Sequence, residues 1–135
     1  MRLPLLALAL LAAAPAAACG PDSDCTVENG TYRIALPAAA PAGALFFAHG
    51  YRGSAAGMMR NDTLRGMATA KGLALVALKS AGDDWMIPNV PNDADGPSRD
   101  EPAYIARVQA DVARRFGIDP ARTILAGFSA GGMMT

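Results

Sequence analysis

The sequence has 135 residues, 52% of them hydrophobic, and its 12 basic and 12 acidic residues give a formal net charge of zero. This balance lacks the excess of lysine and arginine that follows a phosphate backbone, so we expect no nucleic-acid partner. A single histidine and two cysteines do not supply the ligands of a usual metal site, so we expect no metal.

Met1–Ala18 has the organisation of a secretory signal peptide. Arg2 gives a positive start, Leu3–Leu11 is apolar apart from one proline, and Ala16-Ala17-Ala18 is a small-residue cleavage site. The apolar stretch is too short to span a bilayer, so we expect no membrane-spanning anchor. The sequence therefore predicts a secreted protein, extracellular or periplasmic, whose mature chain is one partial domain over residues 19–135.

Cleavage after Ala18 would leave Cys19 as the first residue, which opens two fates for its thiol. A lipoprotein signal usually has leucine or a similar residue three positions earlier, where this chain has Ala16, so a lipid anchor is the less expected fate. Export places thiols in an oxidising compartment, which favours a disulfide between Cys19 and Cys25.

The mature chain is predicted to begin with a β-hairpin. Thr26–Glu28 and Thr31–Leu36 form its strands, and Asn29-Gly30 supplies the two positive-φ positions of a type I′ turn. The second strand alternates as a half-buried strand should, with inward-facing apolar side chains at Tyr32, Ile34 and Leu36.

Two continuous apolar runs, Ala44–Ala48 and Leu73–Leu78, have the pattern of strands that are buried on both faces of a sheet. A helix between them is expected to start near Asn61 or Asp62, which are favourable N-cap residues, and to end at Gly72. The apolar stripe of this helix consists of Leu64, Met67 and Ala68.

A long loop from Lys79 to about Pro97 follows the second apolar run, and loops of this length in a compact domain are often functional. It contains Trp85, the only tryptophan of the chain. Two interpretations of this side chain stay open, a contact with substrate near a cleft and structural packing.

A second helix is expected to start near Ser98 to Asp100, where Ser98 and Glu101 have the spacing of a capping box, and to end at Gly117. Its buried stripe consists of Ile105, Val108, Val112 and Phe116. Thr123–Ala126 forms a third buried strand. Alternation of apolar strands with helices predicts a mainly parallel α/β sheet, preceded by the hairpin.

The segment Gly127–Gly131 fits the pattern G-x-S-x-G. In a nucleophile elbow, a sharp strand-to-helix turn lifts the serine clear of the sheet, and small neighbours avoid clashes in that tight bend. The preceding buried strand and the following Gly132-Met133-Met134 supply this context, so Ser129 is the candidate nucleophile. The alternative is a glycine- and serine-rich turn without chemistry.

His49-Gly50-Tyr51 comes directly after the first apolar run. A loop at this place in α/β-hydrolases presents a backbone N–H to the oxyanion, beside the N–H of the residue after the nucleophile. Tyr51 and Ala130 are therefore the candidate donors. Because the histidine base of this fold follows the serine in the chain, we expect His49 to brace the oxyanion loop, together with Gly50, or simply to occupy a strand end.

Taken together, these residues resemble the secreted polyhydroxybutyrate depolymerase-like and feruloyl esterase-like family of the α/β-hydrolase superfamily. The resemblance covers almost all of the mature chain, and the matching segments are Tyr32-Arg33-Ile34, Leu36-Pro37, His49–Ser54, Asp83-Asp84-Trp85, Arg99-Asp100-Glu101 and Ala126–Met133. It implies the N-terminal part of the α/β-hydrolase fold, with Ser129 as nucleophile and Tyr51 and Ala130 at the oxyanion positions.

The same resemblance implies hydrolysis of polyhydroxyalkanoate, feruloyl or related esters by a Ser-His-Asp triad without a cofactor. The family's acid and histidine follow the elbow, whereas this sequence ends six residues after Ser129. We therefore expect a fragment that is inactive and aggregation-prone by itself. A non-catalytic secreted binding domain and a serine peptidase of the same fold are the alternatives.

Overall fold

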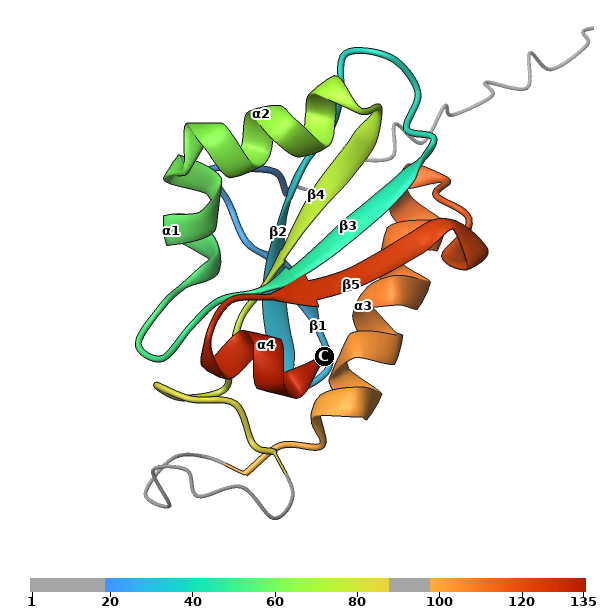
Figure 1. The fold of residues 1–135 in the computed structure, drawn as a ribbon. Coiled ribbons are helices and arrows are strands. Elements are labelled where there is room, and N and C mark those ends of the chain that lie inside the picture. The colour runs from blue at the N-terminus through green and yellow to red at the C-terminus, as the bar shows by residue number, and fades with distance from the viewer. Residues whose placement is uncertain (1–18, 88–97) are drawn as a thin grey trace, which may run out of the picture.

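A computed structural model of the chain describes residues 19–87 and 98–135, so the predicted signal peptide and part of the long loop lie outside the described residues. The described residues form one five-stranded sheet with the strand order β1-β2-β4-β3-β5 (Figure 1). The strands are β1 Cys25–Val27, β2 Gly30–Ala35, β3 Gly43–Ala48, β4 Leu73–Leu78 and β5 Thr123–Gly127. The helices are α1 Ala55–Arg60, α2 Asp62–Ala70, α3 Glu101–Phe116 and α4 Ala130–Met134, with a short 3₁₀ turn at Pro120–Arg122.

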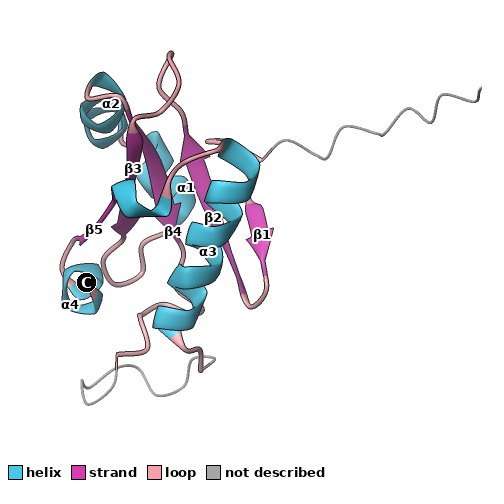
Figure 2. Cartoon of the chain, turned by 90° about the vertical axis from the view of Figure 1, so that its right-hand side faces the viewer, coloured by secondary structure: helices cyan, strands magenta, loops and turns pink. Residues whose placement is uncertain are grey.

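Alternating side chains of the central strands pack on two layers of helices, one on each face of the sheet (Figures 1 and 2). On one face Phe46 and Val76 pack with Val108 of α3, while on the other face Leu75 packs with Met59 of α1. The apolar runs at β3 and β4 are therefore strands covered on both faces, as predicted.

The parallel part of the sheet is β4-β3-β5, in which Phe46 pairs with Val76 on one side and with Leu125 on the other. β2 runs antiparallel to β4, and β1 is antiparallel to β2. This mixed arrangement confirms the predicted parallel α/β core with a hairpin before it. Since β3 and β5 are parallel neighbours, the segments that follow them leave the sheet at the same edge.

The prediction for the hairpin turn was wrong by one residue. Val27 pairs with Gly30, so Glu28 and Asn29 form the turn, and only Asn29 has a positive φ, of 61°. A Cβ on Gly30 would lie 2.5 Å from Cε2 of the Tyr104 ring. Gly30 is therefore needed for the close approach of α3 rather than for the turn.

The helices begin and end close to the predicted positions, with two corrections. Asn61 caps α2 and Gly117, with φ of 66°, ends α3, as predicted. The N-cap of α3 is Asp100, whose Oδ1 accepts from the Ala103 N–H at 2.9 Å, and not Ser98. Helix α1 was not predicted from the sequence.

Several apolar side chains are more exposed than predicted. Met67 is 61% exposed because it lies on the outer side of α2, and Leu36 is 48% exposed because β2 ends one residue before it. In the stripe of α3, Ile105 and Phe116 are half-buried.

β5 lies at one end of the strand order, where Ile124 is 55% and Leu125 39% exposed, so within the described residues this strand is not buried on both faces.

A disulfide joins Cys19 to Cys25 and ties the start of the described chain to β1. Among the described helices, none has the length and apolar character needed to cross a membrane. No group of three or more potential metal ligands comes together within residues 19–87 and 98–135.

Candidate active site

Ser129 occupies a sharp bend between β5, which ends at Gly127, and α4, which begins at Ala130. Its backbone has φ of 53° and ψ of −121°, a conformation that residues with a side chain rarely adopt and that costs of the order of 1–3 kcal/mol. The residue is exposed. A strained, solvent-facing serine between strand and helix has the geometry of a nucleophile elbow.

The two outer glycines of the elbow are needed because the backbone passes so close to itself. A Cβ on Gly127 would lie 2.3 Å from the carbonyl carbon of Gly131, and a Cβ on Gly131 would lie 2.2 Å from the Ala48 carbonyl oxygen. Both distances are far below van der Waals contact. The glycines of the pattern therefore let α4 fold back against β5 and against the end of β3.

A tight turn follows β3 at Gly50–Gly53. The Gly53 N–H donates to the Gly50 carbonyl at 2.9 Å, and Arg52 at the third turn position has φ of 57°. The Arg52 N–H donates to the Asp83 carbonyl at 2.8 Å, which joins the turn to the loop after β4. Tyr51 at the second position is exposed, and the Arg52 guanidinium lies 5.0 Å from the centroid of its ring.

This turn lies beside the elbow. The Phe128 N–H donates to the Ala48 carbonyl at 3.0 Å, and a Cβ on Gly50 would lie 3.0 Å from Cδ1 of Phe128. Ala48 and Gly127 are also paired across β3 and β5. The sheet therefore brings the two motifs that the sequence singled out to the same place.

His49 is fully buried at the start of the turn. Its Nε2 accepts from the Ser80 N–H at 3.2 Å, so Nδ1 carries the proton and donates to the Gly50 carbonyl at 2.7 Å. Burial lowers the pKa of His49, which keeps the imidazole neutral, and the hydrogen bond to Gly50 opposes this shift. The only histidine of the sequence thus has both ring nitrogens engaged in holding the turn.

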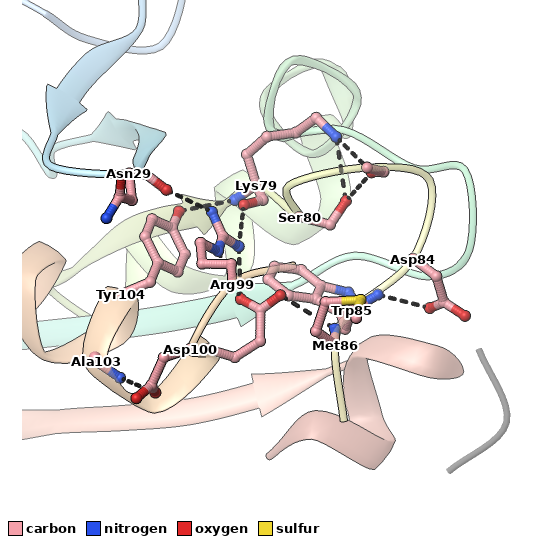
Figure 3. Close-up of polar contacts among 12 residues, drawn as sticks. Asn29, Lys79, Ser80, Asp84, Trp85, Met86, Arg99, Asp100, Ala103 and Tyr104 are labelled. Atoms are coloured by element: carbon pink, nitrogen blue, oxygen red, sulfur yellow. Dashed lines mark hydrogen bonds and ion pairs between the residues drawn. The ribbon is translucent and has the colours of Figure 1, made fainter. Parts of the chain in front are cut away.

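Trp85 packs against His49 and is 1% exposed. Its Nε1–H donates to the His49 carbonyl at 2.7 Å, and the two ring centroids are 5.0 Å apart. Figure 3 shows the indole beneath the loop that follows β4. Among the described residues Trp85 makes packing contacts, and its contact with substrate stays a prediction.

Two parts of this network were not predicted from the sequence: Ser80, and the pairing of Arg99 with Glu101, two residues named there only in a matching segment and as part of a capping box. Ser80 is 2% exposed, and its N–H directly holds the imidazole of His49. Ser80 follows an apolar strand, at the sheet edge where functional residues commonly lie, so the sequence did contain a signal for a role in the site. Glu101 was interpreted as a capping residue because it lies at a helix start, and its burial depends on tertiary packing.

A cavity of about 580 Å³ opens on another side of Ser80, between the β1–β2 turn and the start of α3. Its lining includes Asn29, Lys79 and Arg107 but not Ser129. Because the strained backbone and the close-approach glycines lie at the elbow, the candidate site is the elbow and not this cavity.

No family model matches the sequence, and no curated protein matches it. The structure is similar to S-formylglutathione hydrolase from Agrobacterium tumefaciens, with a TM-score of 0.55 and 19% sequence identity, covering 82% of this chain and 53% of that one. It is also similar to acetyl xylan esterase from Aspergillus awamori, with a TM-score of 0.62 and 18% identity, covering 87% of this chain and 42% of that one. At this level of identity the likeness establishes the fold alone, which is the α/β-hydrolase fold. The chain spans about half the length of these two structures.

Proposed function

We propose that the protein is a secreted serine ester hydrolase in which Ser129 is the nucleophile. The observation that carries the proposal is the exposed Ser129, whose backbone has a strained positive φ at a strand-to-helix bend next to the Gly50–Gly53 turn. The esterases among the solved structures of the same fold support the same class of reaction.

In the proposed reaction the Ser129 hydroxyl attacks the ester carbonyl while a base takes its proton. The backbone N–H groups of Tyr51 and Ala130 donate hydrogen bonds to the tetrahedral oxyanion, and each such donor typically contributes about 2.7–4 kcal/mol. The alcohol leaves, and water then releases the acid from the acyl-enzyme. His49 and Gly50 support the turn that presents the Tyr51 amide.

The base of the triad is proposed to come from a residue outside this sequence. The support is that the sequence has one histidine, which is buried and whose two ring nitrogens bond to Gly50 and Ser80. These 135 residues alone would then retain only the contribution of the oxyanion donors and of binding, which is roughly 10³–10⁴ over water. Polyhydroxyalkanoates and feruloyl esters are the proposed substrate classes, on the resemblance stated above.

The test compares the product of the complete reading frame with its Ser129→Ala variant in p-nitrophenyl ester hydrolysis and in labelling by a fluorophosphonate. We expect labelling at Ser129 and a loss of turnover of at least about 10³-fold in the variant. Ser98→Ala removes another exposed serine and should leave both readouts unchanged.

Two results would overturn the proposal. A protein that binds a polyester or polysaccharide without labelling at Ser129 is a binding domain, and one that cleaves peptide amides in preference to esters is a peptidase. Turnover by the 135-residue chain alone, abolished by Ser129→Ala, would contradict the proposed origin of the base.

A further inference from the structure

A buried ion pair at the start of α3 lies directly behind the loop that holds His49. The side chains of Arg99 and Glu101 are 5% and 1% exposed. The Nη2 and Nε atoms of Arg99 donate to Oε2 of Glu101 at 2.6 and 3.0 Å. The guanidinium lies 3.7 Å from the centroid of the Tyr104 ring, so its position is fixed by packing as well as by charge.

The pair binds both ends of the segment Lys79–Met86. At one end Arg99 Nη2 donates to the Lys79 carbonyl at 2.8 Å (Figure 3). At the other end Glu101 Oε1 accepts from the Met86 N–H at 3.2 Å. One ion pair therefore holds the two ends of this segment together.

Between these two ends, the segment makes the contacts that hold the turn after β3. The Ser80 N–H and the Trp85 indole N–H donate to His49, at 3.2 Å to Nε2 and at 2.7 Å to the carbonyl oxygen. The Asp83 carbonyl accepts from the Arg52 N–H at 2.8 Å. If the ends of the segment separate, these three contacts lose their common support.

We propose that Arg99 and Glu101 are positioning residues for the oxyanion turn and act through the Lys79–Met86 segment. The inference rests on the proposed function, since it assigns these residues to the support of the Tyr51 amide. Neither side chain contacts Ser129 or the turn in the interactions described above. Their effect on the reaction would come from the placement of the turn, and a displacement of about 1 Å at a reacting centre can cost about 10²-fold in rate.

The chain offers a matched control for a purely stabilising role. Asp111 is a second buried carboxylate on α3, with a side chain that is 8% exposed. It accepts from Arg115 Nε at 2.9 Å and from the Tyr32 hydroxyl at 2.8 Å, and these contacts lie at β2 and within α3, away from the Lys79–Met86 segment. Asp111→Asn therefore removes the charge of a buried α3 carboxylate that pairs with the more exposed Arg114 and Arg115, without touching that segment.

The experiment uses the product of the complete reading frame, with Glu101→Gln and Asp111→Asn as the two variants. The indole N–H resonance of Trp85, assigned by its loss in Trp85→Phe, reports directly on the contact with His49. We expect Glu101→Gln to shift or broaden this resonance and to lower kcat about tenfold to a hundredfold, with KM within about twofold. Asp111→Asn should leave the resonance and kcat unchanged.

Glu101→Asp and Arg99→Lys make the test independent of a folding failure. Both keep the charge but shorten or reshape the contact, so we expect an intermediate fall in kcat and a smaller shift of the indole resonance. An unshifted Trp85 resonance in Glu101→Gln, or an equal loss of kcat in Asp111→Asn, would overturn the positioning role. If Ser129→Ala keeps the activity, the proposed function fails, while the indole shift still decides whether the ion pair holds the segment.

Discussion

The turn after β3 and the elbow after β5 lie next to each other, but their surroundings differ sharply. Behind the turn, His49, Ser80, Trp85 and Glu101 are all 2% exposed or less. Ser80 and Trp85 donate hydrogen bonds to His49, and Glu101 accepts from the Met86 N–H next to Trp85. Around the elbow four large apolar side chains face solvent. Phe128 is 68% exposed, and Met133, Ile124 and Leu125 are the other three.

The difference shows that two kinds of interaction position the two parts of the site. The turn is held by a buried polar network that the described residues complete among themselves, without a buried side-chain polar atom that lacks a partner. The elbow is held by close contacts between backbone segments, Gly127 with Gly131 and Gly131 with Ala48, which only glycine permits. We therefore expect substitutions behind the turn to act through lost hydrogen bonds, and substitutions of the elbow glycines to act through clashes with the backbone.

The largest effect is expected from Gly131→Ala in the elbow. The added Cβ would lie 2.2 Å from the Ala48 carbonyl oxygen, and neither backbone can yield without disturbing β3 or α4. We expect a loss of about 3 kcal/mol or more in the free energy of unfolding, measured by urea denaturation. Labelling of Ser129 by a fluorophosphonate should be lost as well.

The neighbouring glycine provides the control for this substitution. A Cβ on Gly132 would have its nearest contact at 3.3 Å, to the Gly127 carbonyl oxygen, and neither glycine has a positive φ. Alanine is favoured over glycine within a helix by about 0.5–1 kcal/mol, so Gly132→Ala should change the free energy of unfolding by less than about 1 kcal/mol. Equal stability of the two variants would show that the elbow is not held by close backbone contact.

The elbow was the part of the site that the sequence predicted best. The pattern of Gly127–Gly131 after an apolar strand predicts a strand-to-helix bend, and the structure confirms that bend at Ser129. The strands β3 and β4 were equally predictable, because both faces are covered and their runs are continuously apolar.

The polar network behind the turn was not predictable in the same way. Its contacts join His49 to Ser80 and Met86 to Glu101, pairs that are far apart in the sequence and whose spacing follows no helical or strand period. Helix α1 was missed for a related reason, since a six-residue helix owes its formation to the Ser54 cap and to packing on the sheet rather than to a periodic pattern. Whether the exposed serine and the two amides act together remains a prediction.

A smaller effect is expected from pH in the buried network. Burial lowers the pKa of His49 below its ordinary value of 6.5, so the unfolded chain takes up a proton at this residue before the folded chain does. The stabilisation is therefore complete above about pH 6.5 and decreases as the pH falls, until His49 protonates in the folded state. Urea denaturation of the 135-residue chain at a series of pH values measures the free energy of unfolding, and NMR of the imidazole measures the pKa of His49 in the folded state.

His49→Gln is the control for the pH series on the 135-residue chain, because it removes the only imidazole among these 135 residues. We expect the variant to be less stable but to lose the dependence on pH just below about 6.5, leaving the steps of the carboxylates near pH 4. An imidazole that titrates at or above pH 6.5 in the folded protein would contradict the neutral, buried state of His49.

The smallest effect on folding stability is expected at the exposed edge of β5. Ile124 is 55% exposed, so Ile124→Thr and Ile124→Val, which both keep a β-branched side chain, should change the free energy of unfolding of the 135-residue chain by about 0.5 kcal/mol or less. Their solubility should differ, because an apolar edge strand is a template for pairing between chains. Light scattering should fall for Ile124→Thr and stay unchanged for Ile124→Val. Equal scattering of the two variants would mean that this edge does not drive association, and a loss of several kcal/mol in Ile124→Thr would mean that another element covers it.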